Sequence, residues 1–205
     1  MKIVHAVAAA GLALASSSSM AAIEIRAVPS VSNVLPGQEY AIQLLIDGDT
    51  TTPGDQPVPS GGLMSAGVAI KFDSSKASLS GLSSIVIPPG LDSDGLGGPP
   101  TRRNSPGDVG YTGFIPLGFP NYTDSLLATI FLVNNATSGS YSLRPDLFFP
   151  LADPRENFVN GQLVDIDPLI TFASPAQVNV VVPEPASALW ALAASVALIR
   201  RRRSI

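Results

Sequence analysis

Apolar and polar residues alternate with a period of two along much of this chain. Successive side chains of a β-strand point to opposite faces, so this alternation predicts strands that each have one face in a core. The alternation is found at residues 23–27, 40–46, 68–72, 140–144 and 177–182. These segments predict an all-β fold.

A further run at residues 126–133, LLATIFLV, is apolar at nearly every position. Its length and the Asn134-Asn135 pair that follows favour a central strand covered on both sides over a buried helix. Weaker runs lie at 79–87, 109–115, 147–149 and 169–172. Turn pairs separate the runs: Pro36-Gly37, Asp47-Gly48, Ser138-Gly139 and Asn160-Gly161. We therefore predict an antiparallel β-sandwich or jelly roll of about nine strands.

Two segments rich in glycine and proline interrupt this pattern, at residues 49–62 and 88–108. Loops longer than about 12 residues are uncommon in a compact domain and often carry function. We expect both segments to be long surface loops on the variable face of the sandwich.

The residue types present exclude most kinds of catalytic site. The sequence has no cysteine, and its only histidine is His5, in a segment that we expect to be removed. Thiol catalysis, Cys-ligated zinc, disulfides and Ser-His-Asp triads are therefore excluded. Aspartate and glutamate are the remaining acid–base groups, which leaves a two-carboxylate glycoside hydrolase as an alternative. We predict that the chain is not an enzyme.

The first residues have the features of a secretory signal peptide. Lys2 gives a basic start, residues 3–15 form an apolar run, and small residues stand at positions 19 and 21. The run is short for a membrane span and a serine tract ends it, which favours a cleaved signal over an anchor or a core helix. We predict a signal peptide over residues 1–21, export through the secretion translocon, and a mature chain that begins near Ala22.

The last residues combine an apolar run with a basic cluster. Residues 186–199 are uncharged and almost wholly apolar, and Arg200, Arg201, Arg202 and Arg203 follow directly. A helix that is apolar on every side belongs in lipid or in a protein core, and the arginines favour lipid with their end on the cytoplasmic side. Its length of about 21 Å is short against a hydrocarbon core of about 30 Å. We predict a short membrane helix, with a buried terminal helix as the alternative.

The motif Pro183-Glu184-Pro185 stands directly before this helix. Motif, helix and arginine cluster follow one another as in the PEP-CTERM sorting tail of Gram-negative bacteria, which residues 182–205 resemble. In that family an exosortase, a membrane protease-transpeptidase, reads the tail. The resemblance implies that an exosortase recognises Pro183, Glu184 and Pro185, and that residues 183–205 anchor the protein transiently in the inner membrane. The prolines also keep the motif extended, which is the form that a protease needs.

The order of the predicted strands resembles the cohesin-like, carbohydrate-binding-module-like sandwich that often precedes this tail. The resemblance lies in four segments: SNVLPGQEYAIQLLIDG, LMSAGVAIKFDSSKASLSGL, DSLLATIFLVNNATSGSYSLRPD and PAQVNVVVPEP. It implies one cohesin-like domain over residues 22–182.

Two pairs of carboxylates have the spacing of cation ligands. The segment Asp92-Ser93-Asp94-Gly95 begins like a calcium loop, but the next three residues have no side-chain oxygen, where a calcium loop needs further ligands. Asp165 and Asp167 also lie two apart. A solvated loop is the preferred interpretation of both pairs, so we predict no cofactor and keep calcium as an alternative.

Charge and aromatic content limit the partners. Without Lys2 and the four terminal arginines, the chain has seven basic and sixteen acidic residues. This balance repels nucleic acid and excludes it as a partner, but it is compatible with cations and neutral glycans. Tyr111 and Tyr122, with Phe114 and Phe119 nearby, are the candidates for a sugar-binding surface, although core packing is the preferred interpretation.

Together these expectations describe an exported bacterial protein of the cell surface or extracellular matrix. Its predicted role is structural or adhesive and non-enzymatic, and the resemblance implies exopolysaccharide as a partner. The alternatives are a secreted, carboxylate-dependent polysaccharide-active enzyme and a protein-recognition module of the cohesin type.

Overall fold

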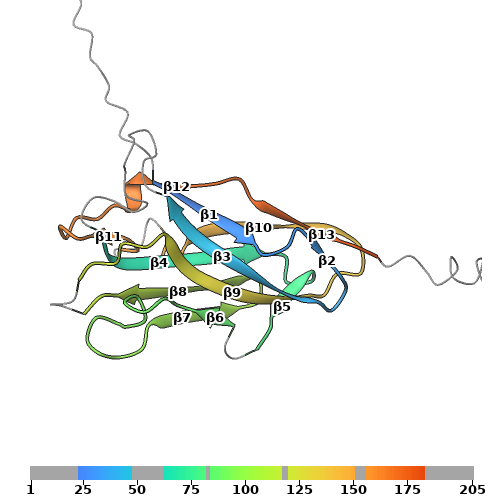
Figure 1. Cartoon of the computed structure of the whole chain (residues 1–205), viewed down its shortest axis with the longest axis horizontal. Coiled ribbons are helices and arrows are strands. Elements are labelled where there is room, and N and C mark those ends of the chain that lie inside the picture. Colours follow the sequence, from blue (N-terminus) through green and yellow to red (C-terminus); the bar gives the residue numbers. More distant parts are fainter. Residues whose placement is uncertain (1–22, 48–61, 82–83, 117–119, 151–155, 183–205) are drawn as a thin grey trace, which may run out of the picture.

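A computed structural model of the chain describes residues 23–47, 62–81, 84–116, 120–150 and 156–182. These residues form two β-sheets that pack face to face, together with one short 3-10 helix, Asp167–Leu169 (Figure 1). The prediction of an all-β sandwich is confirmed. Within the described residues no helix is long and apolar enough to span a bilayer.

The first sheet has the strand order β12-β1-β3-β9-β5, and β6 also pairs with β9. Antiparallel pairing joins most of these strands, but β12 runs parallel to β1 at one edge. The bounds are Ile23–Pro29 for β1, Glu39–Asp47 for β3, Ala77–Leu79 for β5, Ile85–Val86 for β6, Leu126–Asn134 for β9 and Ile170–Phe172 for β12.

The second sheet has the order β2-β13-β10-β4-β8-β7, and β11 also pairs with β4. Here the edge strand β2 is parallel to β13. The bounds are Asn33–Val34 for β2, Leu63–Phe72 for β4, Thr101–Ser105 for β7, Asp108–Phe114 for β8, Gly139–Leu147 for β10, Val159–Asn160 for β11 and Ala176–Val180 for β13.

The core lies between the two sheets and is built from the inward positions of the alternating strands. Ile25, Ile42 and Leu44 from the first sheet and Val68 and Ile70 from the second are fully buried. A polar link crosses this core, because the hydroxyl groups of Tyr40 on β3 and Tyr141 on β10 share a hydrogen bond of 2.7 Å. Paired in this way, the two phenols are buried without an unsatisfied oxygen.

Three sequence expectations about strands are wrong in detail. Residues 101–105 lie inside the predicted loop at 88–108 but form strand β7. The run at 79–87 does not form one strand, because only its ends belong to β5 and β6. Residues 147–149 do not form a separate strand, since Leu147 ends β10.

The strand that is covered on both faces is β4 and not β9. In β9 the side chains of Leu127, Ile130 and Leu132 are buried, whereas Thr129 and Phe131 on the other face are only partly buried. In β4 the six consecutive residues from Ser65 to Ile70 are all buried. The outward positions of β4 from Ser65 to Ala69 are small residues, so another segment of chain can pack directly on them.

Several sequence predictions fall outside the described residues. The signal peptide at 1–21, the sorting motif and helix at 183–199, and the arginine cluster at 200–203 lie there, as does nearly all of the predicted loop at 49–62. They stay predictions.

Candidate functional site

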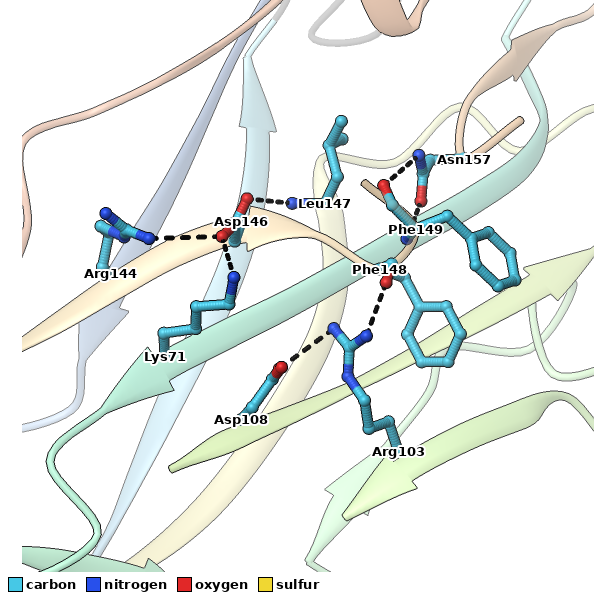
Figure 2. A network of polar contacts seen from close by, with 9 residues as sticks. All are labelled: Lys71, Arg103, Asp108, Arg144, Asp146, Leu147, Phe148, Phe149 and Asn157. Carbon is cyan, nitrogen blue, oxygen red and sulfur yellow. Dashed lines mark hydrogen bonds and ion pairs between the residues drawn. The ribbon is translucent and has the colours of Figure 1, made fainter. Parts of the chain in front are cut away.

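The outer face of the second sheet carries a cluster of five charged side chains. Strand register places them together, because Lys71 on β4 lies opposite Arg144 on β10 and opposite Asp108 on β8. Asp146 and Arg103 occupy the next outward positions on β10 and β7. We call Lys71, Arg103, Asp108, Arg144 and Asp146 the charged face (Figure 2).

Asp146 is the acceptor at the centre of one half of the charged face. Its Oδ2 lies 2.5 Å from Lys71 Nζ and 3.5 Å from Arg144 Nη2, and its Oδ1 accepts a hydrogen bond of 2.9 Å from the Leu147 N–H. Partial burial opposes ionisation of this carboxyl group, but the contacts with Lys71 and Leu147 and the charge of Arg144 outweigh it and lower the pKa of Asp146. Asp146 is therefore a carboxylate at neutral pH.

Arg103 organises the other half. Its Nη2 lies 3.0 Å from Asp108 Oδ1, and its Nη1 donates a hydrogen bond of 2.7 Å to the Phe148 carbonyl oxygen. The guanidinium also lies 4.6 Å from the centroid of the Phe148 ring, as in a cation–π contact. Phe148 packs edge-on against Phe149, with the centroids 4.9 Å apart. Arg103 thus ties the edge strand β7 to the chain that follows β10 (Figure 2).

A buried asparagine fixes this chain segment against the sheet. The Asn157 side chain accepts a hydrogen bond of 2.6 Å from the Phe149 N–H and donates one of 3.0 Å to the Phe149 carbonyl oxygen. Asn157 packs so closely on β4 that a Cβ atom at Gly67 would lie 2.8 Å from Asn157 Oδ1 and 3.0 Å from its Cα. A side chain at position 67 would push Asn157 away. The glycine therefore lets the segment around Asn157 pack directly on the outer face of β4.

The charged face differs in sign from the rest of the molecule. Three of its five members are cations, whereas acidic residues outnumber basic ones more than two to one outside the predicted signal and arginine cluster. The Arg144 side chain is 59 % exposed, and its ion pair with Asp146 is long at 3.5 Å, since Lys71 already neutralises that carboxylate. Its guanidinium therefore has donors that a ligand could reach.

The candidate cation ligands have other contacts. Asp94 Oδ1 accepts hydrogen bonds of 2.8 Å from the N–H groups of Leu96 and Gly98, and these bonds lower the pKa of Asp94. Asp165 accepts a hydrogen bond from the Asp167 N–H. No group of three or more acidic or histidine side chains is placed to hold a metal ion in the described part of the chain.

The aromatic candidates for sugar binding are core residues. Tyr111 is fully buried and donates a hydrogen bond to the Leu127 carbonyl oxygen, and Tyr122 is 7 % exposed and donates to that of Leu126. Burial raises the pKa of both phenols. Phe114 is partly buried, and Phe119 lies outside the described residues. The interpretation of these tyrosines as core residues is confirmed.

Sequence reasoning did not predict the charged face. Lys71 and Arg144 were recognised only as outward strand positions, and Arg103 was assigned to a loop. The outward period-two positions of β4 and β10 were a usable signal for Lys71 and Arg144, because both stand between apolar residues. The sorting residues Pro183, Glu184 and Pro185 and the arginines at 200–203 lie outside the described residues.

Comparisons with known proteins identify the fold. Neither a family profile nor a curated protein sequence matches the chain. Among solved structures, the complex of the cohesin CaCohA2 of Clostridium acetobutylicum with CaDoc0917 has a TM-score of 0.54 at 18 % identity, over 78 % of this chain and 99 % of that one.

Two further cohesins are similar to a comparable degree. The seventh ScaB type I cohesin of Pseudobacteroides cellulosolvens has a TM-score of 0.53 at 16 % identity, over 81 % of this chain and 96 % of that one. A type I cohesin–dockerin complex of Clostridium thermocellum has a TM-score of 0.53 at 12 % identity, over 77 % and 99 %. The described residues therefore form a cohesin-like β-sandwich.

Proposed function

We propose that this chain is a non-enzymatic protein-recognition module of the cohesin type, which acts outside the cell and binds its partner through the charged face. The observation that carries the proposal is the cationic cluster on the outer side of one sheet of an acidic, cohesin-like sandwich. Structural neighbours with this fold include complexes with dockerins. An acidic surface on a partner would complement the charged face, and such complementarity speeds association and selects partners.

The architecture of the charged face supports recognition. Lys71 and Arg103 are held by ion pairs at 2.5 and 3.0 Å, so little side-chain entropy is lost there on binding. Arg144 is exposed and has spare donors. Arginine is frequent in binding hot spots, and the buried ring of Phe148 orders the Arg103 guanidinium from behind.

The partner-binding face is tested by reversing one charge. The mature chain is used to capture proteins from the extracellular fraction of its native host, and each captured candidate is then purified and titrated by calorimetry. We expect Arg144→Glu to weaken binding at least about tenfold, because it adds a repulsive charge at the interface. Arg26→Glu is the matched control, since Arg26 is an ion-paired, partly exposed arginine on the other sheet.

Equal affinities for wild type and Arg144→Glu would place the interface elsewhere. Failure to isolate any partner that binds in purified form would contradict the recognition role. Circular dichroism of both variants shows whether the fold is retained.

Export and sorting complete the proposal. The signal peptide at 1–21 would direct the chain to the translocon, and an exosortase would recognise Pro183, Glu184 and Pro185 while the helix at 186–199 lies in the inner membrane and the arginines at 200–203 hold its end on the cytoplasmic side. The placement of the tail supports this order: Val180 ends β13, and Val181 and Val182 are exposed. The mature module would then belong to the outer surface or extracellular matrix, where exopolysaccharide is present.

A further inference from the structure

A cavity of about 390 Å³ opens at one end of the sandwich, outside the charged face. Its walls come from the segment before β7, from Ile115 and Pro116 after β8, and from residues 120–124 before β9. This volume is within the range of about 300–1,000 Å³ that is typical of small-molecule sites.

The walls of the cavity are held by backbone hydrogen bonds. Tyr122 and Leu63 exchange two bonds of 2.8 and 3.0 Å, and the Phe114 N–H donates one of 2.7 Å to the Ser93 carbonyl oxygen. Asp92 Oδ1 accepts a bond of 3.1 Å from the Gly90 N–H. The described part of the cavity is therefore formed before a ligand arrives, which lowers the entropic cost of binding.

The polar side chains of the cavity are carboxylates, hydroxyl groups and the amide of Asn121. Asp92 and Asp124 contribute carboxylates, and Ser93 and Thr123 contribute hydroxyl groups. No lysine or arginine belongs to the described lining, and neither carboxylate forms an ion pair within the described part of the chain. Burial and the negative charge of Asp124 raise the pKa of Tyr122 to about 12. The field of the Asp124 carboxylate therefore reaches Tyr122 in the wall of the cavity.

Apart from the amide of Asn121, the rest of the lining is apolar and mostly cyclic. Pro89, Pro116 and Pro120 line the cavity and present C–H surfaces, and the mostly buried Tyr122 belongs to its wall. A ligand that fits both parts needs several hydroxyl groups to donate to the carboxylates and an apolar face to lie on the rings. A pyranose ring has both features. An acidic sugar is disfavoured because the two carboxylates repel it, and an ammonium group on the ring is favoured.

We propose that this cavity binds a saccharide unit without negative charge, and that an amino sugar fits it best. The location supports access, because the chain leaves the sandwich after β13 at the end opposite to the end of β8 (Figure 1). A module tethered through its C-terminus would present this cavity away from the tether. The site is separate from the charged face, so it extends the proposed function without depending on it.

The probe is the glucosamine trisaccharide, titrated into the mature chain and followed by NMR chemical-shift changes. We expect saturable shifts at the residues that line the cavity, and binding at least about tenfold weaker in Asp92→Asn and in Asp124→Asn, because each loses a charge-assisted hydrogen bond. Asparagine at position 92 can still accept from the Gly90 N–H, which preserves the loop. The control is Asp73→Asn in the exposed turn after β4, which we expect to bind as wild type does.

Two other probes separate the ligand classes. A galacturonic acid trisaccharide is expected to bind more weakly than the glucosamine trisaccharide, and equal affinity would overturn the charge argument. Trilysine is expected to bind more weakly as well, and equal affinity would overturn the saccharide assignment in favour of a simple cation site. If about 10 mM glucosamine trisaccharide causes no chemical-shift changes, the proposal is overturned, because even a site with a dissociation constant of about 1 mM would be nearly saturated at that concentration.

Discussion

Asp167 is a buried carboxylate that the sequence presented as a candidate metal ligand, and its surroundings give it a different role. Its exposed fraction is 7 %. Oδ2 accepts hydrogen bonds of 2.9 and 2.7 Å from the backbone and side-chain nitrogens of Asn157, and Oδ1 accepts one of 2.6 Å from the Phe158 N–H. Asn157 in turn holds Phe149, so Asp167 supports the segment beside the charged face from behind.

Removal of this carboxylate leaves three donors without their acceptor. We expect Asp167→Ala to lower the free energy of unfolding by about 2–4 kcal/mol, because buried donors that lose a charged partner are costly. Asp165→Ala is the control, since Asp165 is exposed and accepts one backbone bond, and its cost should stay below about 1 kcal/mol. Urea denaturation of both variants measures the difference, and similar losses would contradict the supporting role of Asp167.

At the scale of elements, the alternation of apolar and polar residues predicted the long strands. It did not predict strands that have no face in the core. The strands β1, β3, β10 and β13 were predicted because their inward residues are apolar and their outward residues are mostly polar. Strand β7 is an edge strand with four of five residues exposed, so it has no apolar period, and its Arg and Asn residues read as loop. The two-residue strands β2 and β11 are too short for any period to appear.

The turn between β7 and β8 is the element whose local chemistry is most specific. Gly107 has a φ of +75°, and a Cβ atom there would lie 2.6 Å from the Phe72 carbonyl oxygen. Gly139, the first residue of β10, has a φ of +87°, and no atom lies within 4 Å of where its Cβ would stand. Gly107→Ala therefore meets both backbone strain and a clash, whereas Gly139→Ala meets strain alone.

We expect Gly107→Ala to cost about 2–4 kcal/mol of unfolding free energy and Gly139→Ala about 1 kcal/mol. Thermal and urea unfolding of the two variants provide the measurement. A loss in Gly139→Ala as large as that in Gly107→Ala would mean that the contact with strand β4 does not anchor the hairpin.

For the whole molecule, the sequence determined the composition of the sites but not their assembly. Lys71 and Asp146 are both visible as charged residues, yet their pairing depends on the register of β4 against β10, which hydrophobic alternation alone leaves open. The same holds for the cavity, where Asp92 and Asp124 come from segments on either side of β7 and β8. The order of strands in the sheets brings Asp92 and Asp124 together. That order depends on contacts between strands that are distant in the sequence.

The C-terminal tail can be tested on the protein as its native host makes it. The buried core of the described part is contributed by residues between Ile23 and Val180, so loss of the tail should leave the sandwich folded. We expect the protein recovered from the cell surface or medium to end between residues 183 and 186, with or without an added group, as measured by intact mass and the C-terminal peptide. Glu184→Ala is expected to keep the uncleaved chain in the membrane fraction, whereas Glu24→Ala on β1 should be processed as wild type is. A surface protein that still ends in residues 200–205 would contradict sorting by an exosortase and would make the sandwich a membrane-tethered module.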